Sequence, residues 1–535
     1  MSCYHPWTRY ELLRLVNDPQ IALSDIDTSL IRDMSGLFRH SQRKDFSGIE
    51  TWDTSRVLTM AHMFEGARYF NHDISSWNTS KVKKMNRMFC GATDFNQDLS
   101  SWDTSNVITM ESMFRCASHF NGDIGTWNTA KVTDMSSMFC AAASFSRDLA
   151  WDTSCVTTMS SMFKEATKFN GDISSWNTYR VAKMNSMFNG AASFSQDLSS
   201  WDTSRVTSME SMFRGARYFN GNIGTWNTAK VTDMSSMFQD AGSFNQDLAW
   251  NTSKVATMNS MFQNAEKFNG DISSWNTSKV IDMTSMFSGA RSFSQELPWN
   301  TSQVKSMCGM FMDAVCFNGD IGSWDTSQTV NMSFMFSGAV SFNRSLNSWN
   351  TSSVREFFCM FRDAVSFNHP LDCWDVSSCH RFCYMFEGAI SFNQPLNSWN
   401  MSKAQECTGM FLRALAFNSP LDRWDMSSCR YFGAMFQNAV NFNQPLNSWN
   451  TAKAGYMNDM FSGAISFNQP LRSWKIKKNC CMERMFCGAF SFRQDLRSWS
   501  LRLPEEQKRR KYFLATILAG AAITPEEAFS LPEST

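Results

Sequence analysis

The chain has 535 residues, more than one ordinary globular domain contains, so its length predicts several domains or an array of repeats. Lysine plus arginine and aspartate plus glutamate both number 49, so no net charge favours nucleic acid or acidic lipid as a partner. No apolar run is long enough to span a bilayer, and the charged N-terminal segment lacks the pattern of a signal peptide. We therefore expect no membrane insertion, and a cytoplasmic location is favoured.

Residues 1–24 precede the first repeat, and the stretch RYELLRLV within them predicts a short helix. A degraded first repeat follows in residues 25–38, DIDTSLIRDMSGLF. Because the end coils of a repeat array expose apolar faces that need cover, residues 1–24 are interpreted as an N-terminal cap.

Tryptophan then recurs at 19 positions from Trp52 to Trp499, at intervals of 25 residues or, in three cases, 24. Sequence slots are numbered here from each of these tryptophans, which occupy slot 0. In all 18 repeats from Trp52 to Trp474, slot +11 is Met, +12 is Phe, +15 is Ala and +18 is Phe. This self-similarity predicts a repeat solenoid of about 19–20 coils over residues 25–502.

Within a repeat, the apolar residues change their spacing. In the coil of Trp102 they fall at a helical spacing from Val107 to Ala117, with Ser105 placed to cap a helix. Residues 119–127 alternate apolar and turn residues, which is typical of a short strand. One short helix and one short strand per coil predict an α/β solenoid of the leucine-rich-repeat-like class.

The conspicuous residues of each coil could form either a cofactor site or a core. They recur in every coil, whereas a cofactor site would be special in one place, so we interpret them as one layer of a stacked core. Methionine fills irregular gaps beside aromatic rings in such an interior. In the coil of Trp102 the predicted core residues are Trp102, Met110, Met113, Phe114, Ala117 and Phe120.

Three polar rows each admit a binding interpretation and a structural one. The asparagine of slot +19, such as Asn71, is expected to form an internal row that satisfies backbone groups at a turn. Aspartates four residues before the tryptophan, such as Asp73, could bind a cation, but later coils carry proline there, which favours turn chemistry. The threonines of slot +2, such as Thr54, could order water or ice, although Val376 and Met401 occupy that slot later.

No catalytic residue, cofactor site or metal site is predicted. The seven histidines share no slot, and the sequence contains none of the common hydrolase, metalloprotease or phosphate-loop motifs. The densest cysteine group, Cys373, Cys379 and Cys383, lacks the paired spacing of a zinc site. We expect free thiols in a reducing compartment.

Residues 503–535 begin with Pro-Glu-Glu and become apolar, which predicts a helical C-terminal cap.

The repeat resembles that of a known family. Residues 95–114, FNQDLSSWDTSNVITMESMF, are similar to the unit of BspA-like surface proteins and Mycoplasma-type lipoproteins, and the resemblance extends over about residues 25–500. It implies a leucine-rich-repeat-like solenoid that serves adhesion or protein binding, commonly on microbial surfaces, and it implies no catalytic residues. A cell-surface location is therefore the alternative to a cytoplasmic one.

These observations predict a non-enzymatic, protein-binding scaffold whose partner is another protein and not nucleic acid. A cell-surface adhesin is the alternative, and an ice- or cation-binding rod is the second alternative. Because the core slots are constant, specificity is expected in slots −2, −1, +4, +6, +7, +13, +14 and +16, which vary between coils.

Overall fold

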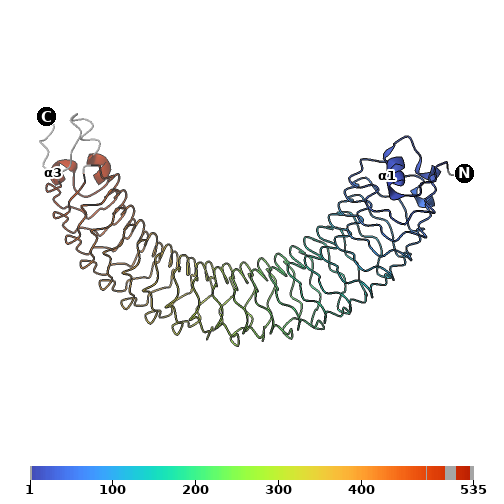
Figure 1. Cartoon of the computed structure of the whole chain (residues 1–535). Helices are drawn as coiled ribbons and strands as arrows, with labels where there is room; N and C mark the ends of the chain where they lie inside the picture. The colour runs from blue at the N-terminus through green and yellow to red at the C-terminus, as the bar shows by residue number, and fades with distance from the viewer. Residues whose placement is uncertain (1–2, 478, 500–513, 530–535) are drawn as a thin grey trace. The chain divides into compact units, whose positions relative to one another are not determined.

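The computed structural model describes residues 3–477, 479–499 and 514–529 (Figure 1). The chain divides into two compact units, Met1–Trp275 and Asn276–Thr535, here called unit 1 and unit 2. Within each unit the backbone winds in successive coils, one for each tryptophan repeat. The named elements are α1 (Arg9–Asn17), η1 (Leu23–Asp25), η2 (Ile49–Thr51) and α3 (Pro525–Phe529), and residues 514–518 are also helical. In the described part of the chain, no helix is long and apolar enough to cross a membrane.

The segment expected to be helical is a run of tight turns in every described coil. The Met60 N–H donates to the Lys84 carbonyl of the next coil at 3.0 Å, and the Phe64 N–H donates to the Met88 carbonyl at 2.8 Å. Between them, the Met63 N–H donates back to the Met60 carbonyl at 3.2 Å. Alternate amides thus bond between coils and within a turn, and the described residues between Trp52 and Trp499 contain no helix.

Backbone geometry explains why a turn run replaces the predicted helix. Slots +10 and +14 have positive φ in each of the 18 coils, as at His62 (61°) and Gly66 (70°), which breaks a right-handed helix. A helix would use its amides along the chain, whereas stacked coils need half of them for the neighbouring coil. Turns closed between residues three apart produce the same apolar spacing that a helix would.

The predicted strand is also absent from its expected place. Within each unit, successive coils pair through a single parallel bridge residue at slot +7, such as Thr109 with Asp134. That residue lies in the stretch expected to be helical, while residues 119–127 form no strand. The repeat solenoid is therefore confirmed, but its coils consist of turns and extended segments instead of a helix and a strand.

Columns of stacked aromatic rings fill the interior of each unit. The Trp102 and Trp127 rings lie 6.3 Å apart and 4° from parallel, and the Phe114 and Phe139 rings lie 5.7 Å apart. Within one coil, Phe114 stacks on Phe120 at 3.9 Å. Offset stacking of this kind adds to the stabilisation that aromatic burial provides.

In the coil of Trp102, two buried polar side chains donate hydrogen bonds to backbone carbonyls of neighbouring coils. Its indole N–H donates to the Ile74 carbonyl at 3.1 Å. The Thr104 hydroxyl donates to the Asn128 carbonyl at 2.9 Å and is 1% exposed. The slot +2 threonines therefore lie inside the solenoid, which overturns the idea that they order ice at the surface.

Both described ends contact the adjacent coils. In α1 the Thr8 side chain accepts a hydrogen bond from the Glu11 amide, and the helix buries Leu12 and Val16. At the other end, the Phe486 N–H donates to the Ile517 carbonyl at 2.9 Å.

Candidate binding groove

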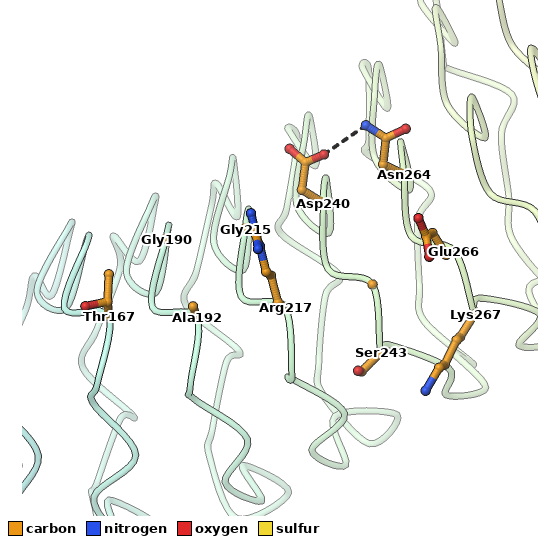
Figure 2. A pocket seen from close by; sticks show the side chains of 11 residues that line it. Thr167, Gly190, Ala192, Gly215, Arg217, Asp240, Ser243, Asn264, Glu266 and Lys267 are labelled. Carbon is orange, nitrogen blue, oxygen red and sulfur yellow. Dashed lines mark hydrogen bonds between the residues drawn. The ribbon is translucent and has the colours of Figure 1, made fainter.

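Unit 1 has a groove along the edge formed by slots +14, +16 and +17. The groove has a volume of about 880 Å³ and extends over five coils (Figure 2). Its lining residues are Thr167, Gly190, Ala192, Gly215, Arg217, Asp240, Gly242, Ser243, Asn264, Glu266 and Lys267.

Small residues create the hollow. Gly190 and Gly215 occupy slot +14 at φ values of 75° and 68°, where glycine carries no steric penalty. Ala192 and Gly242 occupy slot +16, so this slot adds only a methyl group at one coil and no side chain at the other. A Cβ atom added at Gly242 would meet nothing within 4 Å, which shows that the groove is open at this residue.

The charges on the groove balance each other. Arg217, Glu266 and Lys267 are exposed, and Figure 2 shows Arg217 on one coil and Glu266 and Lys267 on another. The Asn264 side-chain amide donates to the Asp240 carboxylate at 2.9 Å. Two basic and two acidic side chains leave no net charge, so the groove lacks the positive field that phosphate groups require.

The predicted core residues lie elsewhere. Trp102, Met110, Met113, Phe114, Ala117 and Phe120 are 0–3% exposed and lie in the interior of unit 1. They contribute to stacking between coils, and none of them lines the groove.

The polar rows serve the backbone of neighbouring coils and turns. The Asn96 N–H donates to the Asn71 side-chain carbonyl at 2.9 Å, but Asn71 is exposed, so this row lies at the surface and is not internal as expected. The Ser75 N–H donates to the Asp73 carboxylate at 2.9 Å, and this bond lowers the pKa of Asp73. Among the described residues, no group of three His, Cys, Asp or Glu side chains could hold a metal ion.

Cysteines that seemed grouped in the sequence differ in exposure. Cys373 is exposed, whereas Cys379 and Cys383 are buried. Burial raises the pKa of the Cys379 thiol to about 12, so this thiol stays protonated and is a weak nucleophile.

One slot of the groove was missed by sequence reasoning. Ser243 and Lys267 occupy slot +17, which was not among the slots expected to determine specificity. Its residue changes from coil to coil, as at Tyr69, Asp94 and His119, and that variation was the available signal.

Comparison with known families agrees with the repeat geometry. A family model described as Mycoplasma protein of unknown function, DUF285, matches residues 15–124, 110–217, 149–249, 195–298, 297–389, 360–439 and 421–515. The chain belongs to this DUF285 family. A comparison of the DUF285 chain with curated proteins finds no match.

The solved structures that are similar to this DUF285 chain share little sequence identity with it. The TLR13–ssRNA13 complex is 10% identical, with 93% of this chain and 88% of that chain covered and a TM-score of 0.17. The plant peptide hormone receptor RGFR1 with RGF2 is 9% identical, with 93% and 90% covered and a TM-score of 0.23. A leucine-rich-repeat protein of Leptospira interrogans is 6% identical, with 79% and 94% covered and a TM-score of 0.20. The assignment to a family therefore depends on the DUF285 model.

Proposed function

We propose that this DUF285-family chain is a non-enzymatic scaffold that binds a segment of another protein in the groove of unit 1. The observation that carries the proposal is the groove itself, with a floor of glycine and alanine and a rim of balanced charges. A floor without long side chains lets a partner backbone approach closely, while the rim charges select its side chains.

The dimensions of the groove fit an extended segment. Five coils at the spacing of parallel strands extend over roughly 20–25 Å, which corresponds to about seven residues of extended chain. Because each coil contributes only a few contacts, affinity would arise from their sum along the array.

A substitution that fills the groove tests the proposal. Gly242→Trp places a large ring in open space at a residue without positive φ, so the coil is expected to fold normally. The matched control is Lys230→Trp, an exposed residue of the same coil that does not line the groove. We expect affinity capture with mass spectrometry to show a partner held by the parent and by Lys230→Trp, and at least tenfold less of it on Gly242→Trp. Equal capture of the partner by both variants would contradict the proposal that the partner binds in the groove.

Adhesion at a cell surface remains a prediction from the family resemblance. Labelling of intact cells that produce the tagged full-length chain tests it, since only a surface protein is reached by an impermeant reagent. A chain that is protected until the cells are lysed would contradict adhesion and leave the scaffold proposal standing.

We also propose that residues 1–24 and 503–535 cap the solenoid of residues 25–502. The buried Leu12 and Val16 of α1 and the bond from Phe486 to Ile517 support this division. Residues 503–513 and 530–535 of the proposed C-terminal cap lie outside the described residues.

A further inference from the structure

Slot +16 of unit 2 is apolar in eight consecutive coils. We call these residues the apolar stripe: Val315, Val340, Val365, Ile390, Leu415, Val440, Ile465 and Phe490. Five of them are 38–63% exposed, and Val315, Val365 and Val440 are half-buried. A contiguous apolar patch of several hundred Å² on a protein surface often marks an interaction site.

Folding does not require apolar residues in this slot. The same slot in unit 1 holds Arg68, Thr93, Ser118, Ala143, Thr167, Ala192, Arg217, Gly242 and Glu266. The coils of unit 1 have the same turn geometry, with positive φ at slots +10 and +14, so charged and polar residues are compatible with the fold. The apolar stripe therefore reflects something other than core packing.

Charges are few at the described rim of the apolar stripe, and most of them are paired with one another. On one side, slot +17 holds Cys316, Ser341, Ser366, Ser391, Ala416, Asn441, Ser466 and Ser491. On the other side, Arg413 pairs with Glu387 at 2.9 Å and with Asp363 at 3.4 Å. Glu387 also pairs with Arg362 at 3.1 Å. A complementary ligand therefore has an apolar face with uncharged flanks.

The spacing of the apolar stripe favours one secondary structure in the ligand. Backbone bonds join successive coils beside it, as from the Ser366 N–H to the Val340 carbonyl at 3.2 Å and from the Ala416 N–H to the Ile390 carbonyl at 3.1 Å. The stripe residues thus repeat at roughly 4.8 Å, the spacing of parallel strands. A helical turn rises about 5.4 Å, a mismatch of about 0.6 Å per coil. Same-face residues of an extended strand are about 6.8 Å apart and lose register within two coils.

The area of the apolar stripe indicates that a single secondary-structure element of a partner covers it. Eight side chains at these exposures present on the order of 500 Å² of apolar surface, which is within the roughly 300–600 Å² of the largest patch on a typical monomer, a patch that is often functional. A second copy of the chain would need about 800 Å² per partner for a stable dimer. The stripe alone falls short of that area, whereas one helix lying along it would cover it.

We propose that the apolar stripe binds an amphipathic α-helix of another protein, about six turns long, with an apolar face and uncharged flanks. The inference depends on the proposed scaffold function and names its partner class, but it involves unit 2 and none of the groove residues. The proposal for the groove and the proposal for the apolar stripe can therefore be refuted independently of each other.

The test uses the full chain and a fluorescein-labelled peptide of 22 residues. The peptide has leucine at helical spacing and alanine, serine and glutamine elsewhere, and a scrambled peptide of the same composition is its control. In the variant Ile390→Ser/Leu415→Ser/Ile465→Ser, serine occupies a slot where Ser118 is native, so folding is expected to be preserved. Tyr431→Ser/Tyr456→Ser is the matched control, because these tyrosines are 37% and 49% exposed in slot +7 of the same unit.

We expect fluorescence anisotropy to show binding of the helical peptide to the parent, at least tenfold weaker binding to the triple variant, and unchanged binding to the tyrosine variant and to Gly242→Trp. Equal affinity for the scrambled peptide, or no effect of the triple substitution, would overturn the proposal. A parent that sediments as a dimer and becomes monomeric in the triple variant would assign the stripe to a second copy. Flotation of the parent, but not the triple variant, with phosphatidylcholine vesicles would assign it to lipid.

Discussion

At the residue scale, most coils depend on a short polar side chain that accepts a hydrogen bond from the backbone two residues on. The Ser105 N–H donates to the Asp103 carboxylate at 2.9 Å. In the next coil the Ala130 N–H donates to the Asn128 side-chain carbonyl at 3.2 Å. Aspartate and asparagine are thus equivalent as turn acceptors, but only aspartate titrates.

This equivalence predicts how acid affects the chain. Asp103, Asp152, Asp325 and Asp375 each have a pKa below the ordinary 3.8 because a serine hydroxyl and amide donate to the carboxylate. Since the folded-state pKa is depressed, each ionised carboxylate stabilises the fold above pH 3.8, and this contribution is lost as the pH falls through the folded-state value.

Replacing these four aspartates with asparagine is expected to lower the melting temperature modestly at pH 7, where the ionised carboxylates stabilise the fold, and to reduce its fall below about pH 4. Thermal melts followed by circular dichroism between pH 2.5 and 7 measure the difference. An acid-induced fall as steep as that of the parent would show that these turns do not couple folding to pH.

At the element scale, side-chain size at slot +2 and side-chain size at slot +5 compensate each other, and the turn that joins the two slots is retained. Most coils combine a threonine at slot +2 with a valine at slot +5, as in Thr104 and Val107. The coil of Trp399 instead combines Met401 with Ala404, both at most 1% exposed. The Ala404 N–H still donates to the Met401 carbonyl at 2.9 Å, so a larger residue at one slot accompanies a smaller one at the other.

This compensation predicts non-additive substitutions. Met401→Thr leaves space in the core and is expected to cost about 2–3 kcal/mol in the free energy of unfolding. Ala404→Val overfills the same turn and is expected to cost about 1–3 kcal/mol. The double variant restores the common pair and should cost less than the sum by about 1–2 kcal/mol in urea denaturation. Strict additivity would show that the two slots pack independently.

At the scale of the whole molecule, the repeat extends to blocks of coils. Residues 121–139 and 220–238 are nearly identical and lie 99 positions apart, which corresponds to four coils. Because the backbone hydrogen bonds of a coil, in the described part of the chain, reach only the adjacent coils, removal of a complete block leaves every remaining coil with an equivalent neighbour.

Deletion of residues 128–226 joins Trp127 directly to Asn227 and preserves the repeat. We expect a folded, soluble chain with unchanged far-ultraviolet circular dichroism per residue. The deletion removes Ala192, Gly215 and Arg217 from the groove, so capture of a groove partner should disappear while binding of the helical peptide persists. Aggregation of the shortened chain would contradict the modularity of the coils.

The sequence by itself determined the solenoid, its period and the family, because slots that stack on themselves must keep the same residue in every coil. The run of apolar residues in slot +16 is also visible in the sequence. That it forms a surface row follows only from the exposure of these residues in the structure.

Only the tertiary structure decided the conformation within a coil. Apolar residues three or four apart suit both a helix and a run of turns, and the choice depends on whether the amide of a residue such as Phe64 finds its acceptor along the chain or in the next coil. The structure also decided that Thr104 faces inward and that Gly242 opens a groove, because burial and hollows arise from neighbouring coils and not from the residues of one repeat.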